Sequence, residues 1–261
     1  MPAVNEISKY FDSIVPYSTK MDFDNVGFLA GRGETAVYRV LCALDITEAV
    51  IAEAAALGAE LIVSHHPLIY QPQKSVTDGS WTGRRLLALL SHNLSAVCLH
   101  TNLDRAEGGV NDALAAALGL RVSDPLDDDP RSQDYYMGRV GALEEPCTFG
   151  EFLPRVKAAL KANGLRYVDA GRAVSRVAVG GGTCGSMLNL ALEKDCDTFV
   201  TADIKHSQFL EAQELGLNLV DAGHFPTENM VVPRLREMLL AGFPELDVRL
   251  SAVSKQPEGY C

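Results

Sequence analysis

A short apolar run, Leu61-Ile62-Val63, ends abruptly in Ser64-His65-His66-Pro67. Gly58 comes just before it and is typical of a helix end, so the run is expected to be a buried strand. Neighbouring side chains of a regular strand point to opposite faces, so His65 and His66 could not bind one ion from inside it. At the strand end, Pro67 favours an extended His66 and removes the next backbone donor. Two imidazoles there suit two neighbouring metal ions, although a core histidine followed by a surface histidine would give the same pattern.

Strand and helix patterns alternate on both sides of this run. In the first half, strands are expected at 37–44 and 96–99, and helices at 45–57, 84–91 and 110–118. Asp45, with Glu48 three residues later, is the expected N-cap of the first of these helices. In the second half, strands are expected at 177–179, 198–201 and 217–220, and Thr148 and Glu151 are expected to form the capping box of a helix. This alternation predicts an α/β fold with two domains, each a sheet flanked by helices, over residues 1–125 and 134–261. The acidic, proline-flanked segment 123–132 would be the linker, and a terminal helix near 232–241 could pack back on the first domain.

Composition and charge narrow the class of protein. The chain of 261 residues is 47% hydrophobic and has a formal net charge of −11. Nucleic acids and anionic membranes bind through Lys and Arg, so this charge disfavours both while leaving room for a local nucleotide pocket. No apolar run is long enough to span a bilayer, and the N-terminus does not resemble a signal peptide. The six cysteines are scattered without a C-x-x-C pair, which favours a reduced, cytoplasmic protein over a thiolate zinc protein.

Most of the histidines share one position in this pattern. Five of the six follow or terminate an expected strand: His65, His66, His100, His206 and His224. Ligands of open α/β sheets bind at the carboxyl ends of the strands, so these side chains could converge. Asp104 follows His100 by four residues, and Glu228 follows His224 by four. Each residue alone could be a helix cap or a hydrogen-bonded loop histidine, but four separate strand-end clusters make coincidence the weaker explanation.

Such a set of histidines and carboxylates predicts a particular chemistry. Imidazole and carboxylate without thiolate suit Zn, Mn or Fe(II). The donors suffice for two divalent ions that share one bridging carboxylate. Two metals roughly 3.5–4 Å apart can activate a water and polarise a carbonyl, imine or phosphoryl group.

Two further segments allow alternative interpretations. The glycine-rich turn 180–185 lies between an expected strand and helix, where free amide groups could hold a phosphate, with Gly181 and Gly182 as the candidates. It matches neither G-x-G-x-x-G nor a Walker A sequence, and an ordinary tight connection is the stronger alternative. The segment from Pro67 to Thr82 could be a lid over a site or an ordinary long connection.

Four stretches resemble, in order, the signatures of the Nif-three-like proteins, commonly labelled GTP cyclohydrolase 1 type 2 homologues. They are Phe23-Asp24-Asn25-Val26-Gly27, Ser64-His65-His66-Pro67, His100-Thr101-Asn102-Leu103-Asp104 and Gly223-His224-Phe225-Pro226-Thr227-Glu228. The resemblance extends from about residue 20 to residue 240 and includes the glycine-rich turn. Ala202-Asp203-Ile204-Lys205-His206 is similar to the Gly-Glu-x-x-His segment of the family, with Ala for Gly and Asp for Glu. Because Asp is one methylene shorter, the role of this acidic position is in doubt.

The resemblance implies a dinuclear metal site in the cleft between the two domains. The ligands would be His65, His66, Asp104, His224 and Glu228, with Glu228 bridging the ions. It also implies a cytoplasmic, ring-shaped homohexamer, in the short form without the domain that some members insert.

These observations lead to one leading functional hypothesis and two alternatives. We expect a metal-dependent hydrolase that acts on a small molecule, a nucleotide or related heterocycle, with a ring opening like that of GTP cyclohydrolase. His100 is the candidate general acid/base unless it is a ligand, and His206 is a second candidate or an orienting residue. The alternatives are a phosphoesterase and a non-catalytic metal-binding regulator, metal carrier or interaction scaffold.

Overall fold

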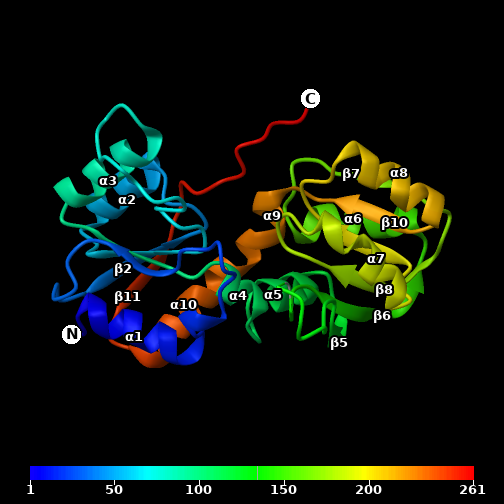
Figure 1. Cartoon of the computed structure of the whole chain (residues 1–261), viewed down its shortest axis with the longest axis horizontal. Helices are drawn as coiled ribbons and strands as arrows, with labels where there is room; N and C mark the ends of the chain where they lie inside the picture. Colours follow the sequence, from blue (N-terminus) through cyan, green and yellow to red (C-terminus); the bar gives the residue numbers. More distant parts are fainter. Residues whose placement is uncertain (134) are drawn as a thin grey trace. The chain divides into compact units, whose positions relative to one another are not determined.

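The chain divides into two compact α/β units, in agreement with the predicted fold class. A computed structural model describes residues 1–133 and 135–261. Unit 1 consists of Met1–Leu103 and Val232–Lys255, and unit 2 of Asp104–Val231 and Gln256–Cys261. Each unit contains one sheet with helices on it (Figure 1). No helix among the described residues combines the length and the apolar character needed to cross a bilayer.

Unit 1 is built on a five-stranded sheet in the order β1-β4-β3-β2-β11. Its strands are β1 (Gly27–Ala30), β2 (Arg39–Ala43), β3 (Leu61–Ser64), β4 (Ser95–Cys98) and β11 (Asp247–Leu250). All pairings are parallel except that of β1 with β4. Its helices are α1 (Val4–Ile14), the 3-10 turn η1 (Tyr17–Thr19), α2 (Glu48–Leu57), α3 (Trp81–Ser91) and α10 (Val232–Gly242). Figure 1 shows α2 and α3 on one face of this sheet, with α1 and α10 on the other.

The core beneath α2 and α3 explains why β3 is an uninterrupted apolar run. Ile62 packs there with Leu41 of β2, Val50 of α2 and Leu89 of α3, and all four are buried. Because helices cover both faces, β3 needs apolar residues throughout rather than in alternation. Its four residues are all buried, and so is His65, the residue that follows it.

The start of α2 differs from the sequence prediction. Thr47 is the N-cap and accepts a hydrogen bond from the Val50 amide, so the helix begins at Glu48. Asp45, the expected cap, instead has its carboxylate bonded to the ring of His66. The helix ends as expected, with Gly58 in the left-handed conformation at its C-terminus.

Unit 2 is built on a six-stranded sheet in the order β5-β6-β8-β9-β10-β7. Its strands are β5 (Arg121–Pro125), β6 (Arg139–Cys147), β7 (Arg166–Val168), β8 (Val174–Val179), β9 (Thr198–Thr201) and β10 (Asn218–Asp221). β8, β9 and β10 are parallel, and the outer strands are antiparallel to their neighbours. The expected capping box of Thr148 and Glu151 opens α6.

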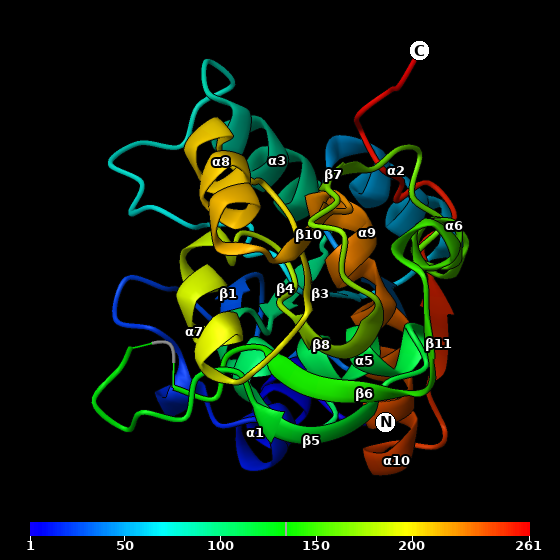
Figure 2. The same cartoon turned by 90° about the vertical axis from the view of Figure 1, so that its right-hand side faces the viewer.

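Helices cover both faces of the second sheet. They are α5 (Val110–Ala117), α6 (Phe149–Ala159), η2 (Gly185–Met187), α7 (Leu188–Glu193), α8 (His206–Leu215), α9 (His224–Glu228) and η3 (Asn229–Val231). Phe152 of α6 and Leu114 of α5 belong to one apolar cluster with Val177 and Val200 of the sheet. Figure 2 shows α7 and α8 on the opposite side of the sheet from α6. Because β8, β9 and β10 are parallel, they end at the same edge of the sheet. The loops that lead from β9 to α8 and from β10 to α9 begin at that edge.

The division between the units falls earlier than the sequence suggested. It lies after Leu103, within the short helix α4 (Thr101–Arg105), and not in the acidic segment. The prediction of a linker is wrong for the first residues of that segment, because Arg121–Pro125 pairs with β6 as an edge strand. Charged residues are common at sheet edges, where they prevent further pairing. Residue 134, the expected start of the second domain, lies outside the described residues, and residues 232–255 return to unit 1.

Candidate metal centre

Three of the strand-end histidines lie together in unit 1. His65 and His66 follow β3, and His100 follows β4, its parallel neighbour. Because parallel neighbours end at the same edge of the sheet, the three rings meet there. One ring nitrogen of each lies within 4.8 Å of the others, and the ring centroids are 5.0–5.6 Å apart. Three nitrogen donors are therefore close enough to bind metal.

Each of these rings is held through Nδ1. His65 Nδ1 lies 2.8 Å from the Leu99 carbonyl oxygen, and His66 Nδ1 lies 2.8 Å from Asp45 Oδ1. His100 Nδ1 lies 2.7 Å from Asp24 Oδ1. Since a carbonyl oxygen can only accept, His65 donates from Nδ1, and in the neutral ring the lone pair is then on Nε2. Metal-binding histidines typically have this arrangement, in which an acceptor on one nitrogen orients the other toward the ion.

Asp24 is the most constrained of these acceptors. Its buried carboxylate also accepts hydrogen bonds from the Thr101 amide at 3.0 Å and the Thr101 hydroxyl at 2.5 Å. Burial raises the pKa of Asp24, but the bonds from His100 and Thr101 and the charge of His100 outweigh it and hold that pKa well below its usual range. Asp24 is therefore ionised at neutral pH and fixes the orientation of the His100 ring.

Unit 2 brings together the other three predicted ligands. His224 and Glu228 lie at the two ends of α9, four residues apart and thus on the same helix face. His224 Nε2 is 3.0 Å from Glu228 Oε2, and one carboxylate oxygen of Asp104 lies within 4.8 Å of one of Glu228. Asp104 and Glu228 are both buried. Two buried carboxylates at this separation repel each other unless a proton or a cation lies between them.

Asp203 orients the His224 ring. Its Oδ2 lies 2.6 Å from His224 Nδ1 and accepts a hydrogen bond from the Thr183 hydroxyl, also at 2.6 Å. The shorter acidic side chain, which made this position doubtful, thus reaches the histidine. Burial lowers the pKa of His224, but the bonds to Asp203 and Glu228 raise it to about 11. Without metal the imidazole is therefore a cation between two carboxylates, and a metal ion would replace its Nε2 proton.

The glycine-rich turn packs against Glu228. Gly182 has a positive φ of 65°, and a Cβ built there would lie 2.1 Å from Glu228 Oε1. Only glycine leaves room for this carboxylate. The Gly181 amide donates to Asn111 Oδ1 at 2.9 Å, and the Gly182 amide donates to Thr227 Oγ1 at 3.1 Å. A phosphate at this turn would therefore compete with two existing hydrogen bonds.

The structure does not gather every predicted residue. His206 is the first residue of α8 and is exposed to solvent. Sequence reasoning, in turn, missed the carboxylates that orient the histidines, Asp24 and Asp45. The one signal for Asp24 was its place in the Phe23-Asp24-Asn25-Val26-Gly27 signature, and Asp45 was interpreted as a helix cap.

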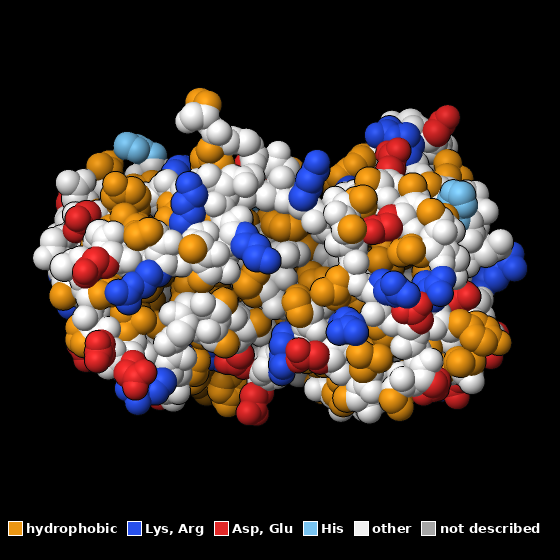
Figure 3. All heavy atoms as spheres, turned by 180° about the vertical axis from the view of Figure 1, so that it is seen from behind, with side chains coloured by type: hydrophobic (Ala, Val, Ile, Leu, Met, Phe, Trp, Pro, Cys, Tyr) orange, Lys and Arg blue, Asp and Glu red, His pale blue; other side chains and the backbone are white. Residues whose placement is uncertain are grey.

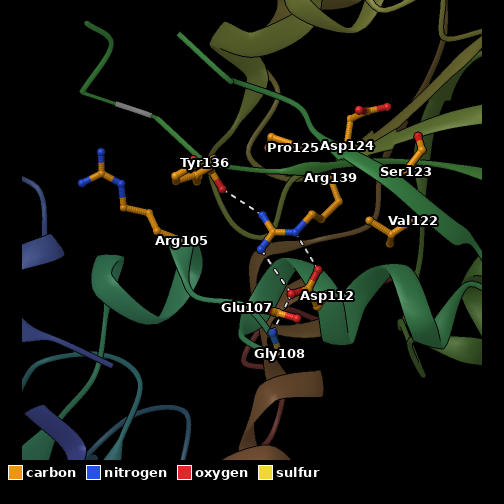
Figure 4. Close-up of a pocket in the computed structure, with 10 residues that line it drawn as sticks. All are labelled: Arg105, Glu107, Gly108, Asp112, Val122, Ser123, Asp124, Pro125, Tyr136 and Arg139. Carbon is orange, nitrogen blue, oxygen red and sulfur yellow. Dashed lines mark hydrogen bonds and ion pairs between the residues drawn. The ribbon is translucent and has the colours of Figure 1, made fainter. Parts of the chain in front are cut away.

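A separate pocket of about 690 Å3 lies in unit 2, between the start of α5 and the β5–β6 hairpin (Figure 4). Arg139 projects into it and forms a bidentate ion pair with Asp112, with Nε 2.6 Å from Oδ1 and Nη2 3.2 Å from Oδ2. Its other donors bind the carbonyl groups of Ala106, Tyr136 and Gly138. Because these contacts balance the buried charge, Arg139 is a structural clamp on the surrounding loops.

Comparison with known proteins identifies the family. The model of the Duf34/NIF3 (NGG1p interacting factor 3) family matches residues 2–257. The chain belongs to the Duf34/NIF3 family. Its relatives include a Clostridium perfringens protein named GTP cyclohydrolase 1 type 2 homolog, 33% identical over 90% of each chain. A Streptomyces coelicolor protein of the same name is 36% identical over 87% of this chain and 82% of the relative.

Solved structures of NIF3 relatives have the same fold. The crystal structure of a Staphylococcus aureus hypothetical protein matches with a TM-score of 0.90 and 27% identity, covering 100% of both chains. A Bacillus cereus protein described as related to NIF3 matches with a TM-score of 0.87 and 26% identity, over 100% of this chain and 99% of that one. The resemblance inferred from the four motifs is therefore confirmed at the level of the family and of the fold.

Proposed function

We propose that this Duf34/NIF3 protein is a dinuclear metal-dependent hydrolase that acts on a nucleotide or related heterocycle. The observation that carries the proposal is a hydrogen-bonding pattern that four of the predicted histidines share, three of them in unit 1 and one in unit 2. His65, His66, His100 and His224 each have Nδ1 bonded to a carboxylate or carbonyl oxygen of their own unit. A structural histidine needs no such uniform orientation, whereas a metal ligand does.

The donor set fits two divalent ions. We propose that five residues from both units hold them, with Glu228 as the bridge: His65, His66, Asp104, His224 and Glu228. Imidazole and carboxylate donors favour Zn, Mn or Fe(II). The two buried carboxylates of unit 2, Asp104 and Glu228, support this assignment, because bound cations would neutralise them. Five ligands, one of them shared, leave coordination positions for water and substrate.

In the proposed reaction the metal ions and the protein side chains have different roles. When bound, two divalent ions lower the pKa of a water and polarise the electrophilic group of the substrate. Asp24 keeps the His100 ring in one orientation with Nδ1 bonded, so Nε2 is the atom that exchanges a proton with substrate. His206 as a second acid/base, and Gly181 and Gly182 as phosphate contacts, stay predictions.

The substrate class follows from the names of the relatives and from the charge of the chain. Proteins called GTP cyclohydrolase 1 type 2 homolog support a nucleotide, and we propose a ring opening like that of GTP cyclohydrolase. On the face seen in Figure 3, basic and acidic side chains lie among one another without a continuous basic field. Together with the net charge of −11, this favours a small substrate over a nucleic acid. We also propose a cytoplasmic homohexamer, on the strength of the family resemblance.

A non-catalytic role is the second candidate. The burial of Asp104 and Glu228 favours it, because a metal that neutralises buried carboxylates would stabilise the fold even without turnover. A regulator, a metal carrier or an interaction scaffold would lose stability on metal removal but would catalyse nothing. A phosphoesterase would cleave phosphate from the nucleotide and leave its base intact.

One experiment separates these functions. The purified chain is incubated with a nucleotide panel that includes GTP, with and without added Mn or Zn, and base opening and phosphate release are recorded together. His66→Ala should lose both bound metal and turnover, while His92→Ala, at the exposed C-terminal end of α3, should keep both. Phosphate release alone indicates the phosphoesterase. Turnover that persists in metal-free His66→Ala contradicts the proposal.

A further inference from the structure

Two exposed aromatic side chains lie beside the histidine cluster of unit 1. Phe23 is 54% exposed and Tyr70 is 43% exposed. Their ring centroids are 6.4 Å apart in an edge-to-face arrangement. The Tyr70 ring meets His100 in the same way, with centroids 6.2 Å apart. An aromatic surface thus runs from solvent to the histidine that Asp24 orients.

Hydrogen bonds hold this surface in place although its rings are exposed. Phe23 directly precedes Asp24, whose carboxylate is bonded to His100. The Asn25 side chain donates to the carbonyl oxygen of Ile69 at 2.6 Å, one residue before Tyr70. The two loops are therefore tied to each other and to the cluster. A ligand that stacks there gains contact with rings that are already positioned, so little ordering entropy is lost on binding.

A positive charge lies next to the same loop. Lys20 Nζ donates to the carbonyl oxygens of Asp24 at 2.6 Å and Met21 at 3.3 Å. Both acceptors are neutral, and within residues 1–133 and 135–261 no ion pair neutralises this ammonium group. Aromatic faces beside an uncompensated cation match a ligand with a planar ring and an anionic group, which is the chemistry of a nucleotide.

We infer that Phe23 and Tyr70 form a stacking platform for the purine ring of the substrate, with Lys20 compensating its phosphates. This inference rests on the proposed function, since it names the substrate class of that site. The platform places the ring next to His100, where the proposed acid/base chemistry takes place. Tyr70, the exposed aromatic residue near the start of the 67–82 segment, is thereby given a role in binding.

The test is a binding measurement on the metal-loaded, full-length chain. The probe is 7-deaza-GTP, which keeps a planar purine-like ring but lacks the N7 needed for ring opening, and inorganic triphosphate is the ring-free control. Phe23→Leu removes the π face, and Phe23→Trp restores one. Tyr167→Leu is the matched control, because Tyr167 is also 54% exposed but belongs to β7 of unit 2. Calorimetry gives the affinities, and metal content is measured on the same samples.

Stacking on an aromatic side chain typically contributes about 1–3 kcal/mol, so Phe23→Leu should weaken 7-deaza-GTP binding roughly fivefold or more. Triphosphate affinity should not change, Phe23→Trp should restore binding, and Tyr167→Leu should behave as wild type. Equal affinity in wild type and Phe23→Leu, or no binding of 7-deaza-GTP to wild type, overturns the inference. A change of oligomeric state in Phe23→Leu with unchanged affinity also overturns it, in favour of a contact between copies. If the wild-type chain binds 7-deaza-GTP through its ring but holds no metal or turns over no nucleotide, the proposed function is overturned and the stacking platform is not.

Discussion

The Nδ1 atom of His100 lies 2.7 Å from a carboxylate oxygen of the buried Asp24. The two residues are 76 positions apart in the sequence, and the bond fixes the ring of the only clustered histidine whose proposed role is proton transfer. Asp24 also accepts two bonds from Thr101, so one carboxylate holds both residues that directly follow Leu99 after β4.

Replacing Asp24 by Asn should destabilise the chain in a pH-dependent way. The Asp24 pKa is lowered in the folded protein, so its charge contributes stability above the ordinary aspartate pKa of about 4 and loses that contribution as the pH falls below it. Asp24→Asn should therefore cost about 2 kcal/mol at pH 7, with a smaller cost below about pH 4. Urea unfolding across this range tests the prediction. Asp78→Asn, in the exposed loop before α3, should show neither effect.

Replacing Asp203 by Asn should weaken metal binding and lower the pKa of His224. The lost carboxylate is one of the two groups that raise that pKa to about 11. Loss of a carboxylate that orients a ligand histidine typically reduces metal affinity about 10–100-fold. Asp195→Asn is a close control, since Asp195 also has a positive φ, 56° against 54°, but is exposed at the end of α7. NMR titration of the metal-free protein and a competition assay with a chelator give the two readouts, and equal affinities for the two variants would argue against the orienting role.

A methyl group at Gly182 should displace Glu228. The positive φ of Gly182 strains any L-residue by about 1–2 kcal/mol, and the added Cβ would also lie 2.1 Å from Glu228 Oε1. Gly171→Ala isolates the first effect, because Gly171 has φ of 74° and nothing within 4 Å of its Cβ position. Gly182→Ala should be the less stable variant and should bind less metal, whereas Gly171→Ala should keep its full metal content. Thermal unfolding measures the stability of both variants, and elemental analysis measures their metal content. Equal losses of stability and metal in the two variants would contradict a steric clash between the added Cβ and Glu228.

Arg139 should stabilise unit 2 without affecting the metal centre. Its side chain is almost completely buried and paired with Asp112, so Arg139→Met leaves a carboxylate without its cation and should cost about 3 kcal/mol. Arg131→Met removes the cation of the solvent-exposed Arg131–Asp129 pair and should leave the unfolding free energy unchanged. Chemical unfolding measures both. If Arg139→Met is as stable as wild type but binds less metal, Arg139 supports the metal centre and the purely structural role is contradicted.

The sequence predicted those parts of the centre that depend on local pattern. The apolar run before His65 and the four-residue spacing between His224 and Glu228 are visible in one window of sequence. His65 follows the expected strand, whereas the short helix α9 that carries His224 and Glu228 was not predicted. Asp45 and Asp24 are bonded to histidines 21 and 76 positions away, and no local pattern reports such distant pairing. Asp45 also fits the sequence pattern of a helix cap, and that interpretation was wrong: Thr47 caps α2, and Asp45 is bonded to His66.

The predicted domain boundary differs from the division between the two units for a similar reason. An acidic, proline-flanked segment is typical of a linker, but an edge strand such as β5 tolerates the same residues because one of its sides faces solvent. The return of α10 and β11 to unit 1 depends on the pairing of β11 with β2, which are separated by about two hundred residues. The strand and helix patterns predicted the central parallel strands but not the edge strand β5, and tertiary pairing decided which unit each element joined.

The most direct test of the central claim is anomalous scattering from crystals grown with Mn or Zn and measured at the metal edge. The proposal predicts two anomalous peaks per chain, one on each side of Glu228, with ligand bonds from His65, His66, Asp104 and His224. Crystals of Glu228→Gln should lose at least one of the two peaks. A single peak in wild type, or none near these five residues, would contradict the dinuclear centre on which the account depends.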